Sequence, residues 1–223
     1  MIKFNFEHLE ESIPLEKGEN NIFVVENRGI YGKIIYSLYT HNGYFKFFNE
    51  NYEQLDCKKV MVISNPMEYC LDDANIKGKL YSYIDKQLVV DQEIKSEIMN
   101  SYATLSAKVS DYVDQVLDAE IVYADEISIK NILKAMELSF EQGGVDSIFS
   151  KVQLFLNIIK EIAGDCIVIF LGLSGMLTSA EYELVLESIR LNDQTVLMLE
   201  NDIYNLKELS YYYFDNDFCL YKK

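Results

Sequence analysis

The stretch of residues 166–206 constrains the fold more than any other part of the chain, because two apolar runs flank one amphipathic segment. Residues 167–171 and 196–199 are almost continuously hydrophobic, which is typical of strands covered on both faces. Between them, Thr178 and Glu181 have the spacing of a capping box and predict the start of a helix. A strand, a helix and a strand at this spacing predict a right-handed crossover between parallel strands.

The N-terminal third alternates short strands with one helix. Residues 2–6 alternate as in a half-buried strand, and apolar runs follow at residues 22–25, 45–48 and 59–64. An amphipathic pattern predicts a helix over residues 30–40. Strands at both ends of the chain indicate an α/β fold.

The middle of the chain has a different character. From about residue 72 to residue 162 almost nothing resembles a strand, and proline is absent. Residues 91–117 carry apolar side chains at alternating spacings of four and three, which is typical of a coiled-coil seam. The seam consists of Ile98, Tyr102, Leu105, Val109, Tyr112 and Val116. A helix of this length would span about 36 Å, too long for a compact sheet domain.

Two more helices are predicted in the middle segment, over residues 127–138 and 145–163. We therefore expect a head built from both chain ends, residues 1–66 and 164–223. A helical leg of residues 67–163 is inserted between them.

Composition limits the class of protein. Of the 223 residues, 49% are hydrophobic, which excludes disorder as the main state. No apolar run reaches the length of a membrane span, and the first residues lack the pattern of a signal peptide, so we expect a cytoplasmic protein without a membrane partner. The four cysteines are scattered and form no C-x-x-C pair, which favours reduced thiols over zinc or disulfides.

The formal net charge of −16 counts against a nucleic-acid partner, because binding a polyanion needs a basic surface. Charge acts locally, however, so the 20 Lys and Arg residues could gather on one surface while the acids lie elsewhere. Bound divalent cations would also offset carboxylates.

An α/β head invites a search for the phosphate loop G-x-x-x-x-G-K-[ST]. Gly29, Gly32 and Lys33 resemble part of it, but the first glycine is too close and Ile34 replaces the hydroxyl residue that would bind Mg²⁺. The pattern favours a glycine-containing turn at a helix start. The two histidines lie beside no nucleophile signature, so hydrolase triads are also disfavoured and no catalytic residue is predicted.

An acidic cluster lies between two helices of the predicted leg. It comprises Asp118, Glu120, Asp125 and Glu126, which a turn could bring together. Hard divalent cations prefer several carboxylate and carbonyl oxygens from a flexible loop, as this segment could supply. The alternative is a solvated loop in which Asp125 caps the next helix.

The chain resembles the short form of the Csn-two family of type II-A CRISPR adaptation proteins. The shared motifs follow the family's order over nearly the whole length. They are LEESIPL at residues 9–15, the strand and helix of residues 22–33, FKFFN at 45–49, EIKSEI at 93–98, DEIS at 125–128, VLMLENDIYNL at 196–206 and Asp217-Phe218.

The resemblance implies a P-loop-NTPase-like α/β head with a degenerate phosphate loop, a helical leg and a ring-shaped homotetramer. The ring would hold double-stranded DNA, preferably at ends, with Ca²⁺ supporting the structure. Neither ATPase nor nuclease activity is implied. The family acts with the adaptation integrase complex and the effector nuclease in acquiring spacers for antiviral defence.

The resemblance also implies site residues. The acidic cluster corresponds to the family's Ca²⁺ region. Lys33 and Lys46 fall on basic positions of the family, and Lys17 is offset by one. Arg28 joins these DNA-binding candidates because all four lie in the N-terminal part of the head, near its turns.

Two other function classes stay open from the residues alone. One is a nucleotide-binding enzyme built on the same head, which Ile34 after Lys33 disfavours. The other is an interaction scaffold whose leg helices bind protein rather than DNA, with which the net charge of −16 is compatible.

Overall fold

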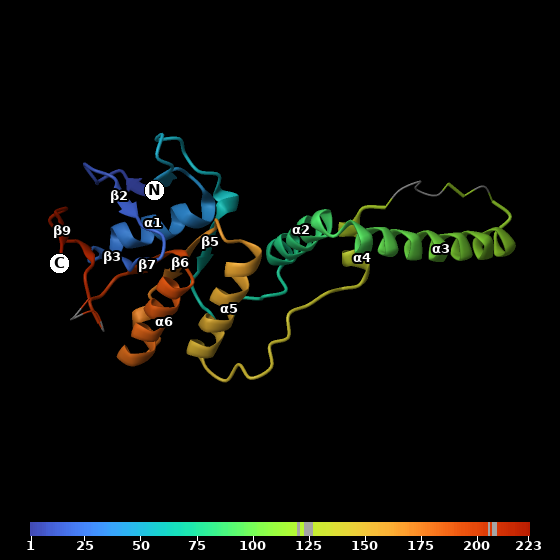
Figure 1. Ribbon diagram of the computed structural model, residues 1–223. Coiled ribbons are helices and arrows are strands. Elements are labelled where there is room, and N and C mark those ends of the chain that lie inside the picture. Colours follow the sequence, from blue (N-terminus) through green and yellow to red (C-terminus); the bar gives the residue numbers. More distant parts are fainter. Residues whose placement is uncertain (120, 123–126, 205, 207–208) are drawn as a thin grey trace. The chain divides into compact units, whose positions relative to one another are not determined.

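The computed structural model describes residues 1–119, 121–122, 127–204, 206 and 209–223. The chain forms two compact units (Figure 1). Met1–Cys70 and Gln142–Lys223 make up the first, and Leu71–Glu141 make up the second. Within the described residues, all strands belong to the first unit.

A six-stranded sheet forms the centre of the first unit, in the order β5-β6-β7-β3-β8-β9. The first five of these strands run parallel, and only β9 is antiparallel to its neighbour. Every residue of β6 and β7 is buried, which confirms the predicted strands covered on both faces. In sheet order the strands are Val60–Ile63, Ile167–Leu171, Thr195–Glu200, Asn21–Val25, Tyr212–Phe214 and Leu220–Lys222.

A second, antiparallel sheet has the order β2-β1-β4, with β2 Ile13–Leu15, β1 Ile2–Phe6 and β4 Phe45–Phe48. Its inner face carries Phe4, Phe6, Phe45 and Phe47, all buried. These rings pack against the six-stranded sheet, with the Phe4 and Phe23 centroids 5.1 Å apart. Pro14 is tolerated within β2 because β2 is an edge strand of this sheet.

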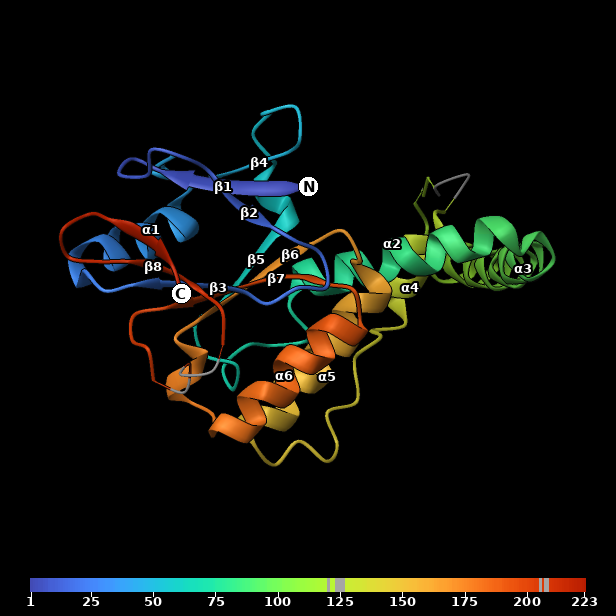
Figure 2. The same ribbon diagram turned by 60° about the vertical axis from the view of Figure 1, so that its left-hand side comes forward.

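Helices cover both faces of the six-stranded sheet. Helix α1 (Arg28–Thr40) packs with the small sheet on one face through Ile30, Ile34 and Leu38. Helices α5 (Ile148–Ile162) and α6 (Ser179–Leu191) lie on the opposite face (Figure 2). The predicted capping box of α6 is confirmed: the Thr178 Oγ1 accepts from the Glu181 backbone, and the Glu181 carboxylate accepts from the Thr178 backbone.

The position of α5 changes the expected boundaries of head and leg. The sequence pattern assigns residues 145–163 to the leg, but α5 belongs to the first unit. It buries an apolar stripe at helical spacing, with Val152, Phe155, Leu156 and Ile159 all nearly inaccessible. Phe155 meets Phe170 of β6 edge to face at 6.2 Å. The second unit is therefore shorter than the predicted leg.

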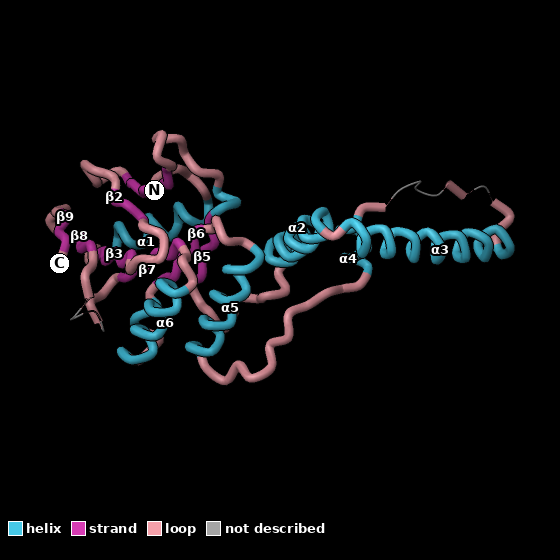
Figure 3. Tube along the Cα trace, viewed as in Figure 1, coloured by secondary structure: helices cyan, strands magenta, loops and turns pink. Residues whose placement is uncertain are grey.

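The second unit consists of helices within its described residues (Figure 3). These are α2 (Ala74–Val90), α3 (Gln92–Val116) and α4 (Ile129–Ala135). A small core joins them, centred on Tyr81, Ile129 and Leu133. Asp91 separates α2 from α3, and its side chain caps α3. In the described ranges no helix has the length and apolar character needed to cross a membrane.

Candidate nucleic-acid interface

The turn after β3 and the start of α1 contain the residues that resemble part of a phosphate loop in sequence. The turn is short, since Glu26 and Asn27 alone join β3 to α1. The Asn27 Oδ1 accepts hydrogen bonds from the backbone N of Gly29 at 3.0 Å and of Ile30 at 3.1 Å. Two of the amides that a helix N-terminus could offer to a phosphate are thereby paired with the chain's own side chain.

Lys33 also lies away from the position of a phosphate-loop lysine. It is exposed on α1, one turn beyond the helix start, and its Nζ lies 5.9 Å from the centroid of the Tyr44 ring. The next residue, Ile34, is fully buried in the core beneath α1. An aliphatic side chain there serves packing and offers no oxygen to a metal ion.

A buried carboxylate occupies the carboxyl end of β7. Glu200 is only 1% exposed and accepts hydrogen bonds from the Ser174 backbone N at 3.1 Å, the Ser174 Oγ at 2.8 Å and the Tyr182 hydroxyl at 3.3 Å. Burial raises the pKa of Glu200 to about 7, although these hydrogen bonds oppose the shift. Gly172, in the left-handed conformation at φ 63°, starts the turn that brings Ser174 to it.

The four basic candidates do not form one cluster. Lys17 precedes β3 and Arg28 follows it, so they lie at opposite ends of that strand, roughly 17 Å apart at ~3.3 Å per residue. The Lys17 Nζ forms an exposed ion pair with Asp193 at 2.9 Å, and the pKa of Lys17 is raised by that carboxylate. Arg28 is exposed as the first residue of α1.

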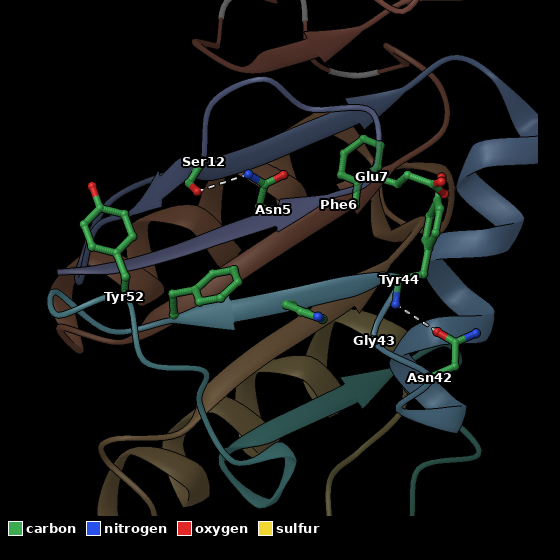
Figure 4. A pocket seen from close by; sticks show the side chains of 10 residues that line it. Asn5, Phe6, Glu7, Ser12, Asn42, Gly43, Tyr44 and Tyr52 are labelled. Carbon is green, nitrogen blue, oxygen red and sulfur yellow. Dashed lines mark hydrogen bonds between the residues drawn. The ribbon is translucent and has the colours of Figure 1, made fainter.

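Lys33 and Lys46 are brought together by two adjoining hollows. One hollow, of about 620 Å³, lies over the outer face of β1 and β4 and includes Lys46 in its lining (Figure 4). The other, of about 500 Å³, lies beside α1 and includes Lys33. The two share Glu7, Asn42 and Tyr44 in their walls. We call them together the β4 groove.

Sequence reasoning missed several residues of the β4 groove. Tyr52 lines the larger hollow, and Lys3 lies over it, with the Lys3 Nζ 4.9 Å from the ring centroid and 3.3 Å from the hydroxyl. The alternation of IKFNF and YFKFF was the available signal, because it places Lys3 and Lys46 on the face opposite the buried phenylalanines.

The predicted Ca²⁺ ligands are only partly within the described residues. Asp118 lies exposed beyond the end of α3, whereas Glu120, Asp125 and Glu126 lie outside the described residues. Among the residues that are described, no group of three His, Cys, Asp or Glu side chains is arranged to hold a metal ion. A set of four carboxylates has the donor chemistry that Ca²⁺ prefers.

Comparisons with known proteins agree with the fold. Two relatives named CRISPR-associated protein Csn2 are each 25% identical: that of Streptococcus agalactiae over 99% of this chain and 97% of the relative, and that of Enterococcus faecalis over 98% of both. The crystal structure of Stu0660 of Streptococcus thermophilus covers 96% of this chain and 75% of its own, with a TM-score of 0.54 and 15% identity. At that identity the likeness supports the mixed α/β fold alone.

A sequence model of the family described as CRISPR-associated protein (Cas_Csn2) matches residues 38–218. The match includes α1 from Leu38 onward, the helices of the second unit and the strands from β4 to β8. Because it spans most of the chain, the protein belongs to the Csn2 family of CRISPR-associated proteins, as the resemblance to the Csn-two family predicted.

Proposed function

We propose that this Csn2 family member is a non-catalytic, ring-forming homotetramer that binds double-stranded DNA, preferably at ends, during type II-A spacer acquisition. Its partners would be the adaptation integrase complex and the effector nuclease, and its location the cytoplasm. The observation that carries the proposal is membership of a CRISPR-associated family across residues 38–218. The geometry of the described residues supports the individual parts.

The strand order and the turn after β3 support a P-loop-like head without nucleotide turnover. A central parallel strand followed directly by a helix is the place of a phosphate loop in such folds. Here that turn has two residues, and the Asn27 side chain pairs the helix amides. Ile34 is buried, so the position after Lys33 has no metal-binding oxygen. This favours a degenerate site over the alternative of a nucleotide-binding enzyme.

Exposed basic side chains that form no salt bridge in the described part of the chain support DNA binding despite the net charge of −16. Arg28 and Lys33 are exposed in the first unit, and no salt bridge within the described residues involves either of them. A tetramer multiplies each exposed cation fourfold around a ring, which gives a polyanion several simultaneous contacts. Lys17 would have to leave Asp193 to join them.

The C-terminal half of α3 supports the proposal of a tetramer. Leu105, Val109, Tyr112 and Val116 repeat at spacings of four, three and four, and each is more than half exposed. An apolar seam of this kind requires a partner helix whose side chains form the matching holes. Ca²⁺ held by Asp118, Glu120, Asp125 and Glu126 would order the chain at the end of the same helix.

The salt dependence of duplex binding tests the proposal. Affinity for a linear duplex should fall steeply with salt, because each neutralised phosphate releases counterions. Replacing Lys33 by Met should lower the logarithmic slope by about 1 for each phosphate that this lysine neutralises. Lys58→Met, an exposed lysine of the same unit, is the matched control and should leave the slope unchanged. Absence of duplex binding would instead favour the protein-interaction scaffold.

A further inference from the structure

The β4 groove combines aromatic and cationic side chains in alternation. Tyr44, which directly precedes β4, and Lys46 and Phe48 of β4 line the groove, and the buried Phe45 and Phe47 separate them along the chain. Successive outward side chains on a strand lie roughly 7 Å apart, at ~3.4 Å per residue. On the neighbouring strand Asn5 pairs with Lys46 and Lys3 with Phe48. The outer face of this small sheet thus presents two aromatic rings with a cation between them.

Tyr52 supplies a further ring at the end of the groove. Its side chain is 68% exposed (Figure 4). The Lys3 Nζ lies over the Tyr52 ring, 4.9 Å from its centroid. At the other end Lys33 stands 5.9 Å from the ring of Tyr44. Exposed rings beside cations are the elements with which proteins bind single strands, because every base has a face that stacks and every linkage carries a negative charge.

The charge of the groove is opposite to that of the chain. Lys33 and Lys46 line it and Lys3 stands at its end, whereas Glu7 is the only acidic side chain in the lining of the two hollows as described. Glu7 and Lys33 are both exposed, so solvent screens both charges, whereas Lys3 and Lys46 are half-buried and less screened. In a chain of net charge −16 this local excess of cations favours an anionic ligand over a cationic or neutral one.

Hydrogen-bonding groups suited to base edges line the groove beside the rings. Asn5 donates to the Ser12 Oγ at 3.2 Å, and the Asn42 Oδ1 accepts from the Tyr44 backbone N at 3.0 Å, so both amides are held in place (Figure 4). The hydroxyl of Tyr44 is buried and makes no hydrogen bond within the described structure. A buried polar group without a partner is uncommon, and a water molecule or an ion is enough to complete it.

We propose that the β4 groove binds unpaired nucleotides, so that the protein distinguishes a DNA end with a single-stranded overhang from a blunt end. Tyr52 and Phe48 would stack on bases, while Lys3 and Lys46 would contact the linking phosphates. The inference rests on the proposed function, since the overhang belongs to a duplex held by the same protein. Paired bases are stacked within the duplex and cannot offer their faces to these rings.

Fluorescence anisotropy on the full-length protein tests this inference with three probes. They are a blunt duplex, the same duplex with an unpaired 3′ extension of about four thymidines, and the corresponding single strand alone. Stacking of one base is sufficient to strengthen binding of the extended duplex over the blunt one by about tenfold. Phe48→Ala with Tyr52→Ala should abolish that preference and weaken single-strand binding, while leaving the blunt-duplex affinity unchanged.

Controls separate this inference from the proposed function. Tyr221→Ala removes an exposed tyrosine from β9, outside the groove, and should keep the preference. If the double variant folds poorly, Lys46→Met is tested in its place. It keeps the apolar stem of the side chain and should lower single-strand affinity. Equal affinity of the wild type for both duplexes would overturn the inference and leave duplex binding standing. Single-strand binding that depends on Tyr52, without any duplex binding, would support the groove and refute the proposed function.

Discussion

The buried carboxylate of Glu200 should make the stability of the protein depend on pH in a direction that can be calculated. Its pKa in the folded chain is about 7, against an ordinary value of 4.5, because the group is nearly inaccessible to water. Between these values the folded protein holds a proton that the unfolded chain has released. The free energy of unfolding therefore falls as pH rises through this window and levels off above it.

The magnitude follows from the two pKa values. Across the whole window, the ionisation of Glu200 lowers the free energy of unfolding by about 3 kcal/mol. Between about pH 5.5 and about pH 8.5, where the chain stays clear of its isoelectric point, the loss is about 2 kcal/mol. Glu200→Gln has no titrating group at this position, and its amide oxygen can still accept from Ser174. Relative to Glu200→Gln, the wild type should therefore lose about 2 kcal/mol of unfolding free energy as the pH rises from about 5.5 to about 8.5.

Urea unfolding followed by circular dichroism at both pH values measures this difference. All other carboxylates are common to the two proteins and cancel. Glu187→Gln, which removes an exposed carboxylate from α6, is the matched control and should follow the wild type. A wild-type minus Glu200→Gln difference that is the same at both pH values would refute the reasoning, because it would mean that Glu200 ionises as easily in the folded chain as in water.

Three further outcomes are expected. Chelation of Ca²⁺ should lower the melting temperature and added Ca²⁺ should restore it, whereas a Glu120→Ala, Asp125→Ala variant should not respond to either treatment. Val109→Glu on the exposed seam of α3 should reduce the mass measured by light scattering below that of a tetramer, and an unchanged mass would contradict the proposed role of the seam. Phosphate release from ATP should stay at background in the wild type and in Lys33→Ala; turnover that disappears in the variant would show an active nucleotide site.

Local patterns predicted the parts of the fold that depend on neighbours in sequence. The crossover from β6 through α6 to β7 was predictable, because two apolar runs and the capping box of Thr178 and Glu181 are separate signals that agree. The strand at Ile13–Leu15 was missed because three residues with a proline carry no period, and only pairing with β1 reveals them as a strand.

Features that depend on tertiary contacts could not be predicted from the sequence patterns. The apolar stripe of α5 looks the same whether it packs in the leg or on the six-stranded sheet, so the unit boundary could not be read from it. The β4 groove needs the pairing of Asn5 with Lys46, two residues that are distant along the chain. Glu200 ends an otherwise apolar strand, and nothing in that pattern reveals that Ser174 and Tyr182 cover it.

The proposed DNA clamp is tested most directly by the topology of the DNA. A ring that surrounds the duplex must be loaded from an end, whereas a surface that only touches phosphates does not distinguish ends from circles. The measurement is a gel shift with one duplex sequence prepared as a linear fragment and as a covalently closed circle, at matched salt and Ca²⁺. We predict that the linear duplex binds and the closed circle does not, and that cutting the circle restores binding. Equal affinity for both forms would contradict the ring.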